Sequence, residues 1–62
     1  MDSIKVPDIK TGDRFWHNGE LYTARSDAQV IGAGTWYRVH TDSGTLDLHC
    51  RGTVLQAGSE ER

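Results

Sequence analysis

The amino-acid sequence predicts an all-β fold, a small five-stranded antiparallel meander that closes into a partly open barrel. Three observations support this class. No apolar stripe with the period of an α-helix runs for a useful length. Short runs rich in β-branched and aromatic residues alternate with turn signals. Closing such a meander into a barrel also hides the unpaired edges of the sheet.

The N-terminal segment offers apolar side chains without a clear strand. Ile4, Val6 and Ile9 can pack against a core. Pro7 lacks a backbone N–H, which excludes these residues from a central strand position. We therefore expect this segment at the margin of the fold.

A first hairpin is predicted from residues 14–17 (RFWH) and 20–26 (ELYTARS) around Asn18-Gly19. Asn-Gly is the strongest short hairpin signal, because both central residues of a type I′ turn take positive φ. The expected pairs across the strands are His17 with Glu20, Trp16 with Leu21, Phe15 with Tyr22, and Arg14 with Thr23.

Only one face of this hairpin can point inward in so thin a domain. We expect Phe15, Tyr22 and Ala24 to face the core, because the other face carries Arg14, Thr23 and Arg25. Trp16 and Leu21 then lie outside. The alternative is that Trp16 is a core residue on a strongly bent strand, since large exposed apolar groups are less common than buried ones.

A second hairpin is predicted from residues 35–41 (TWYRVHT) and 45–50 (TLDLHC), after a glycine-containing loop at 27–34. With Ser43-Gly44 as a two-residue loop, one face collects Tyr37, Val39, Thr41, Leu46, Leu48 and Cys50. The other face collects Trp36, Arg38, His40, Thr45, Asp47, His49 and Arg51. In this register His40 lies opposite Asp47, and Trp36 lies opposite Arg51, where a cation–π contact is feasible.

The same register argues against a metal site or a catalytic centre. Cys50 points into the core, away from His40 and His49, and His17 lies on the other hairpin, whereas a zinc site needs converging ligands. A Cys–His nucleophile pair fails for the same reason. His40 opposite Asp47 has no nucleophile beside it. We therefore predict a protein that is not an enzyme, with no metal, no cofactor and no small-molecule substrate.

The last strand is expected at residues 53–57 (TVLQA), after a bend at Arg51-Gly52. The polar tail that follows is expected to fray. The prediction is a single domain over residues 1–62, with a core over about residues 9–57 and frayed ends at 1–3 and 58–62.

Composition limits the setting of the protein. A chain of 62 residues with one cysteine cannot form an internal disulfide, which fits a reducing compartment. No apolar run could span a bilayer, and MDSIKVPDIK lacks the apolar region of a signal peptide. We therefore predict a cytoplasmic protein that does not bind membranes.

The segments TGDRF, NGELYTARS and YRVHTDSGTLDL resemble the small SH3-like or KOW-like barrels of bacterial and phage accessory proteins. The likeness consists of GDRF opening a strand, the Asn-Gly turn and a V-x-T-x-S-G hairpin, and it covers residues 9–56. It implies an SH3-like barrel that serves as a binding module, and it names no ligand.

The candidate binding surface follows from the outward residues of both hairpins. It consists of Trp16, Leu21, Trp36, Arg14, Arg25, Arg38 and Arg51. Tryptophan and arginine are frequent interface anchors, so we predict a surface that binds a partner protein or a second copy of the chain. The alternative is a nucleic-acid-binding barrel that stacks bases on tryptophan and meets phosphates with arginine.

Charge favours the protein partner. The net charge is −2, and between Arg14 and Thr53 four arginines are balanced by four acidic residues. A protein that coats nucleic acid by bulk electrostatics needs excess positive charge. The loop at residues 27–34 is a secondary candidate for recognition.

Overall fold

The computed structural model describes residues 2–59. In this part of the chain it contains seven strands and one 3-10 turn. They are β1 (Ser3–Lys5), η1 (Val6–Asp8), β2 (Asp13–His17), β3 (Glu20–Thr23), β4 (Gln29–Ile31), β5 (Trp36–Thr41), β6 (Gly44–His49) and β7 (Thr53–Ser59). These residues include no helix of the length and apolarity that crossing a membrane requires.

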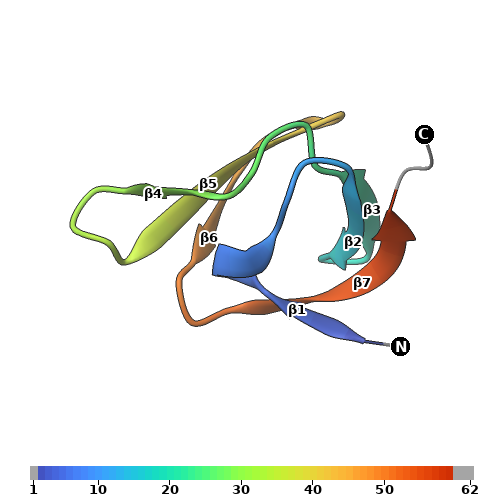
Figure 1. The fold of residues 1–62 in the computed structure, drawn as a ribbon, viewed down its shortest axis with the longest axis horizontal. Helices are drawn as coiled ribbons and strands as arrows, with labels where there is room; N and C mark the ends of the chain where they lie inside the picture. Colours follow the sequence, from blue (N-terminus) through green and yellow to red (C-terminus); the bar gives the residue numbers. More distant parts are fainter. Residues whose placement is uncertain (1, 60–62) are drawn as a thin grey trace.

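The strands form two antiparallel sheets (Figure 1). The four-stranded sheet has the order β1-β7-β2-β3, and the three-stranded sheet has the order β4-β5-β6. An isolated bridge between Ala24 and Thr41 joins the end of β3 to the end of β5. The N–H of Arg25 donates to the carbonyl of His40 at 2.6 Å, which continues this junction. The sheets are therefore linked through the segment that follows β3.

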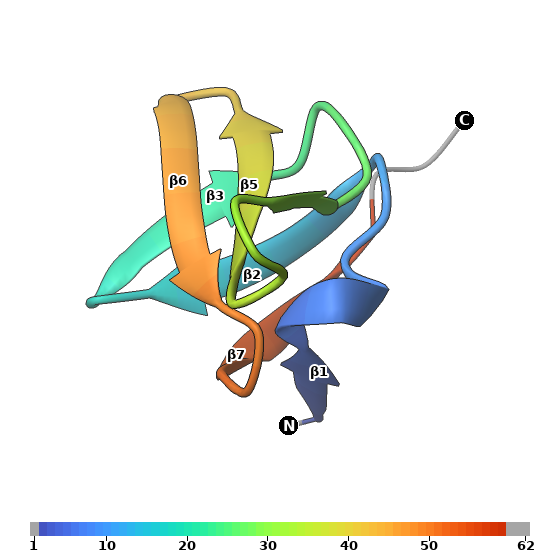
Figure 2. The same ribbon diagram turned by 90° about the vertical axis from the view of Figure 1, so that its left-hand side faces the viewer.

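The all-β class predicted from the sequence is confirmed, but the strand count is corrected. The five predicted strands correspond to β2, β3, β5, β6 and β7, and the structure adds β1 and β4. β1 and β4 have only three residues each and lie beside turn residues. Such short segments show no clear alternation of apolar and polar residues from which a strand could be predicted. In Figure 2, β1 lies beside β7, the last strand of the chain.

The first hairpin has the predicted register. Arg14 pairs with Thr23, Phe15 with Tyr22, Trp16 with Leu21, and His17 with Glu20. Asn18 and Gly19 have φ values of 52° and 80°. Both angles lie in the left-handed region that a type I′ turn requires, so the Asn-Gly signal determined this hairpin.

The register predicted for the second hairpin is wrong by two residues. The turn runs through Asp42 and Ser43, and Thr41 pairs with Gly44, whose φ is 112°. A turn centred on Ser43-Gly44 in the type I′ form would need positive φ at Ser43, and Ser43 does not adopt it. The single glycine instead follows the turn, where one residue with positive φ completes the loop.

A shift of two residues keeps the side chains within β5 and β6 on their predicted faces, because faces alternate with a period of two. The individual partners change. His40 now pairs with Thr45, Arg38 with Asp47, Trp36 with His49, and Tyr37 with Leu48. The predicted pairings of His40 with Asp47 and of Trp36 with Arg51 are therefore wrong.

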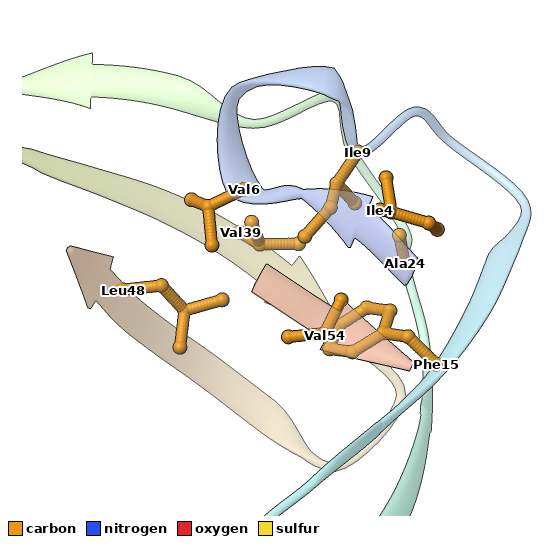
Figure 3. Close-up of a cluster of buried hydrophobic side chains, with 8 residues drawn as sticks. All are labelled: Ile4, Val6, Ile9, Phe15, Ala24, Val39, Leu48 and Val54. Carbon is orange, nitrogen blue, oxygen red and sulfur yellow. The ribbon is translucent and has the colours of Figure 1, made fainter. Parts of the chain in front are cut away.

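The hydrophobic core lies between the two sheets (Figure 3). It consists of Ile4, Val6, Ile9, Phe15, Ala24, Val39, Leu48 and Val54. It begins before residue 9, because β1 and η1 place Ile4 and Val6 inside. Ser3, Gly58 and Ser59 belong to strands, and the fraying expected at residues 1 and 60–62 lies outside the described residues.

Candidate functional site

The seven predicted binding residues do not form one surface. Arg14, Trp16 and Leu21 belong to the four-stranded sheet, whereas Trp36 and Arg38 belong to the three-stranded sheet. Arg25 follows β3, and Arg51 lies in the turn between β6 and β7. Both tryptophans point away from the core that separates the sheets. The structure therefore divides the predicted surface into two faces.

The outer face of the four-stranded sheet carries a continuous row of apolar side chains. Trp16 on β2 pairs with Leu21 on β3 and with Leu55 on β7. Trp16 is 39% exposed, Leu55 is 48% exposed, and Leu21 is half-buried. We call Leu21, Trp16 and Leu55 the apolar row. Side chains directly opposed across antiparallel strands contact one another, so the row is one patch across three strands.

Two basic residues share this outer face. Arg14 precedes Trp16 by two positions on β2, and Lys5 on β1 pairs with Thr53, two positions before Leu55. Strand alternation assigns both cations to the side of the apolar row. Among residues 3–59, the other paired strand positions on this side are Ser3, Leu21, Thr23, Thr53, Leu55 and Gly58, and a register shift between β2 and β7 leaves Ala57 without a partner beside Gly58. None of these positions carries a carboxylate.

The outer face of the three-stranded sheet centres on Trp36. This side chain is 46% exposed and meets the His49 ring edge-on, with ring centroids 5.3 Å apart and an interplanar angle of 80°. The backbone N–H of Arg51 donates to Nδ1 of His49 at 3.1 Å. Nδ1 is therefore an acceptor, and Trp36 packs against an imidazole rather than against a guanidinium.

Arg38 on this second face is engaged by a carboxylate. Its Nε donates to Oδ1 of Asp47 at 2.9 Å, and its Nη2 donates to Oδ2 at 3.3 Å. This paired contact lowers the pKa of Asp47 and raises that of Arg38. The positive charge of Arg38 is therefore compensated within the sheet by the carboxylate of Asp47. On the same face, Nδ1 of His40 lies 3.2 Å from Oγ1 of Thr45.

Cys50, predicted to be a core residue, is not a member of the core cluster. It follows β6 in the turn before β7, it is half-buried, and its N–H donates to the carbonyl of Thr35 at 2.8 Å. Within residues 2–59, no three side chains of the His, Cys, Asp and Glu types lie close enough to hold a metal ion. The same part of the chain contains no pocket.

The segment predicted as a loop at residues 27–34 contains a strand, β4, which pairs with β5. Its start is fixed by Asp27, whose Oδ1 accepts from the N–H of Thr11 at 2.8 Å and from the Thr11 hydroxyl at 2.9 Å. The backbone bond, followed by the hydroxyl bond, lowers the pKa of Asp27. Val30, in the middle of β4, is 57% exposed, so this hairpin keeps a large apolar side chain at the surface.

Sequence reasoning missed Leu55 and Lys5 as members of an outer face. The run TVLQA predicts a strand, but its two adjacent apolar residues, Val54 and Leu55, leave open which one faces the core. The answer depends on β7 lying between β1 and β2, a pairing of strands distant in sequence. No local signal specifies that pairing.

Comparison of the chain with protein-family models, with curated proteins and with solved structures gives no match.

Proposed function

We propose that the protein is an SH3-like, partly open barrel that acts as a binding module without enzymatic activity. Its ligand in this proposal is a partner protein, and the contact surface is the apolar row with the adjacent Arg14. The proposal narrows the surface expected from the sequence to one of its two faces.

The strand order supports the barrel. Along the chain, β2 to β6 form one hairpin in the four-stranded sheet and then the three-stranded sheet, and β7 returns to pair with β2. The segment between Glu20 and Ile31 passes from one sheet to the other, because β3 pairs with β2 while β4 pairs with β5. The bridge from Ala24 to Thr41 continues the hydrogen bonding between them. A sheet that bends onto a second sheet in this way protects its edges.

The apolar row is the single observation that carries the binding function. Trp16 and Leu55 are the most exposed members of a patch that crosses three strands of one sheet. Contiguous apolar surface of this kind marks interaction sites on soluble proteins, and tryptophan is the most frequent anchor in such sites. Trp36, in contrast, packs on His49 and is flanked by Arg38, which forms an ion pair with Asp47.

The nucleic-acid alternative has less support on either face. Stacking of bases needs nearby cations that are available for phosphates. Beside Trp36, the guanidinium of Arg38 is already bound to Asp47. Beside Trp16, only Arg14 and Lys5 contribute positive charge among the described strand residues. This alternative is therefore treated as an outcome of the test below.

The test is affinity capture from extract of the native cells with three baits, each with and without nuclease. The baits are the wild type, Trp16→Ala and Trp36→Ala, and a ¹H–¹⁵N correlation spectrum of each bait shows that it is folded. We expect a nuclease-resistant protein that Trp36→Ala retains and Trp16→Ala loses by at least about tenfold, as for an anchor residue. Loss on nuclease treatment supports nucleic acid instead. Equal capture by both variants rejects the apolar row.

A further inference from the structure

Resting on the proposed function, we propose a chemical class for the partner. It is an extended segment of another protein that carries an apolar or aromatic residue between two carboxylates. The apolar residue packs on the apolar row, and the carboxylates meet Arg14 and Lys5.

The two cations lie on opposite sides of the apolar row. Leu55 pairs with Trp16, and Arg14 pairs with Gly58, which follows Leu55 on β7. Lys5 pairs with Thr53, which precedes Leu55. Along the direction of the strands, the order is therefore Arg14, then the row, then Lys5. A ligand that crosses the row meets a cation before it and another after it.

The spacing of the cations sets the spacing of the carboxylates. The two cations differ by about four residue levels along the strands, or about 13 Å, and by two strand positions, or about 10 Å, across the sheet. The diagonal is about 16 Å, which an extended chain covers in about five residues. Two carboxylates about five positions apart, with the apolar residue between them, match this geometry.

Both cations are available to a ligand. Lys5 is exposed and Arg14 is half-buried, and neither side chain makes an ion pair or a hydrogen bond with any of the residues 2–59. Complementary charge at the border of an apolar patch gives specificity and suppresses wrong partners. The absence of a carboxylate from the strand positions of this face leaves that complement to the ligand.

A second copy of the chain fits this face less well. In a two-fold dimer through this face, the same patch is present on both partners. Arg14 and Lys5 of one copy would then face Arg14 and Lys5 of the other, with no carboxylate at the strand positions between them. Like charges across an interface are unfavourable. The charge of the face therefore favours an acidic segment over self-association.

The test uses three peptides titrated into ¹⁵N-labelled protein. The acidic probe is acetyl-Glu-Ser-Leu-Trp-Ser-Glu-amide, and the controls replace both Glu residues by Gln or by Lys. We expect the acidic probe to shift the amide signals of Trp16, Leu21 and Leu55, with an affinity about fivefold to tenfold above that of the Gln peptide. The double variant Arg14→Gln, Lys5→Gln should remove this preference. Lys10→Gln, at an exposed position outside the strands, should retain it.

The outcomes separate this inference from the proposed function. Equal binding of all three peptides at the apolar row overturns the acidic partner and leaves a protein-binding face. Binding that shifts the amide signals of the three-stranded sheet instead overturns both the acidic partner and the apolar row as the binding surface. If the acidic probe at millimolar concentration shifts none of these amide signals, the acidic partner is also rejected. The proposed binding function is tested separately by the capture experiment. If analytical ultracentrifugation shows that the molecular mass doubles as the protein concentration rises, the partner at this face is a second copy of the chain instead.

Discussion

Neighbouring residues of β2 have opposite roles. Phe15 is fully buried and stacks on Tyr22, with ring centroids 5.9 Å apart, whereas Trp16 is 39% exposed on the other face. The pleat of the strand alone produces this difference. Sequence reasoning identified it because the Asn-Gly turn set the register of the first hairpin. A large aromatic residue can therefore serve as core or as contact surface according to its parity in the strand.

A second residue-scale feature is the carboxylate of Asp27, which ties the start of the β4 hairpin to Thr11. Its pKa is lowered in the folded protein. A lowered pKa stabilises the fold above the ordinary value of about 4, and this contribution is lost as the pH falls through the folded value. The contact therefore strengthens the protein at neutral pH and fails in acid.

We predict that Asp27→Asn lowers the urea midpoint at about pH 7 and that its difference from wild type shrinks at about pH 2, because the protonated wild type has lost the charge as well. Thr11→Val removes only the hydroxyl donor and should have a smaller effect. Urea unfolding followed by tryptophan fluorescence at both pH values measures this. An Asn variant with the same deficit at both values would show that the charge of Asp27 contributes nothing.

The elements differ in how far the sequence specifies them. The first hairpin is determined by a two-residue signal, Asn18-Gly19, and its register is as predicted. In the second hairpin, the two-residue loop was predicted at Ser43-Gly44, and the structure has it at Asp42 and Ser43. The predicted faces of the strand residues are correct because the predicted and observed registers differ by two residues, an even number. The predicted cross-strand partners are wrong.

The Asp42 turn also joins the two sheets. Oδ1 of Asp42 accepts from the N–H of Thr23 at 3.1 Å, and the N–H of Asp42 donates to the carbonyl of Thr23 at 3.1 Å. The turn of one hairpin thus supplies hydrogen-bond partners to the edge strand of the other.

We predict that Asp42→Ala destabilises the protein by about 1 kcal/mol, because the N–H of the buried Thr23 loses its acceptor. Amide hydrogen exchange at Thr23 should accelerate more than exchange at Phe15. Ser43→Ala is the matched control, since Ser43 enters the turn through its backbone N–H. Equal exchange rates at Thr23 in both variants would contradict a role for the Asp42 side chain.

At the scale of the molecule, the sequence predicted the all-β class and the sorting of apolar residues, but not the two sheets. The division depends on β7 pairing with both β1 and β2, and on the bridge from Ala24 to Thr41. These contacts join distant segments, and no local turn chemistry specifies them. The candidate surface changed for the same reason. Trp36 is exposed as predicted, and of the two alternatives for Trp16 the structure shows the exposed one, yet the two residues belong to different sheets.

The shared core has a consequence for unfolding. Both sheets contribute to one hydrophobic cluster, with Phe15 and Val54 from the first and Val39 and Leu48 from the second. A domain of this size has a net stability of only about 3–5 kcal/mol, so neither sheet has enough buried surface to persist alone.

We predict a single cooperative transition reported identically from both sheets. In Trp36→Phe the remaining Trp16 reports on the four-stranded sheet, and in Trp16→Phe the remaining Trp36 reports on the three-stranded sheet. For each variant, the urea transition followed by tryptophan fluorescence should coincide with the transition followed by far-ultraviolet circular dichroism. Fluorescence that changes well before the dichroism signal in either variant would indicate that its sheet opens separately.

The position of β7 between β1 and β2 bears on the order in which the four-stranded sheet assembles. Among the described strands, β1 pairs with β7 alone, so the first strand in the sequence depends on the last for its place in the sheet. Without β7, Ile4 lacks both its partner across the strands, Val54, and the strand that holds β1 against the core. We therefore expect the pairing of β1 with β7 to come late in folding, after β7 has paired with β2.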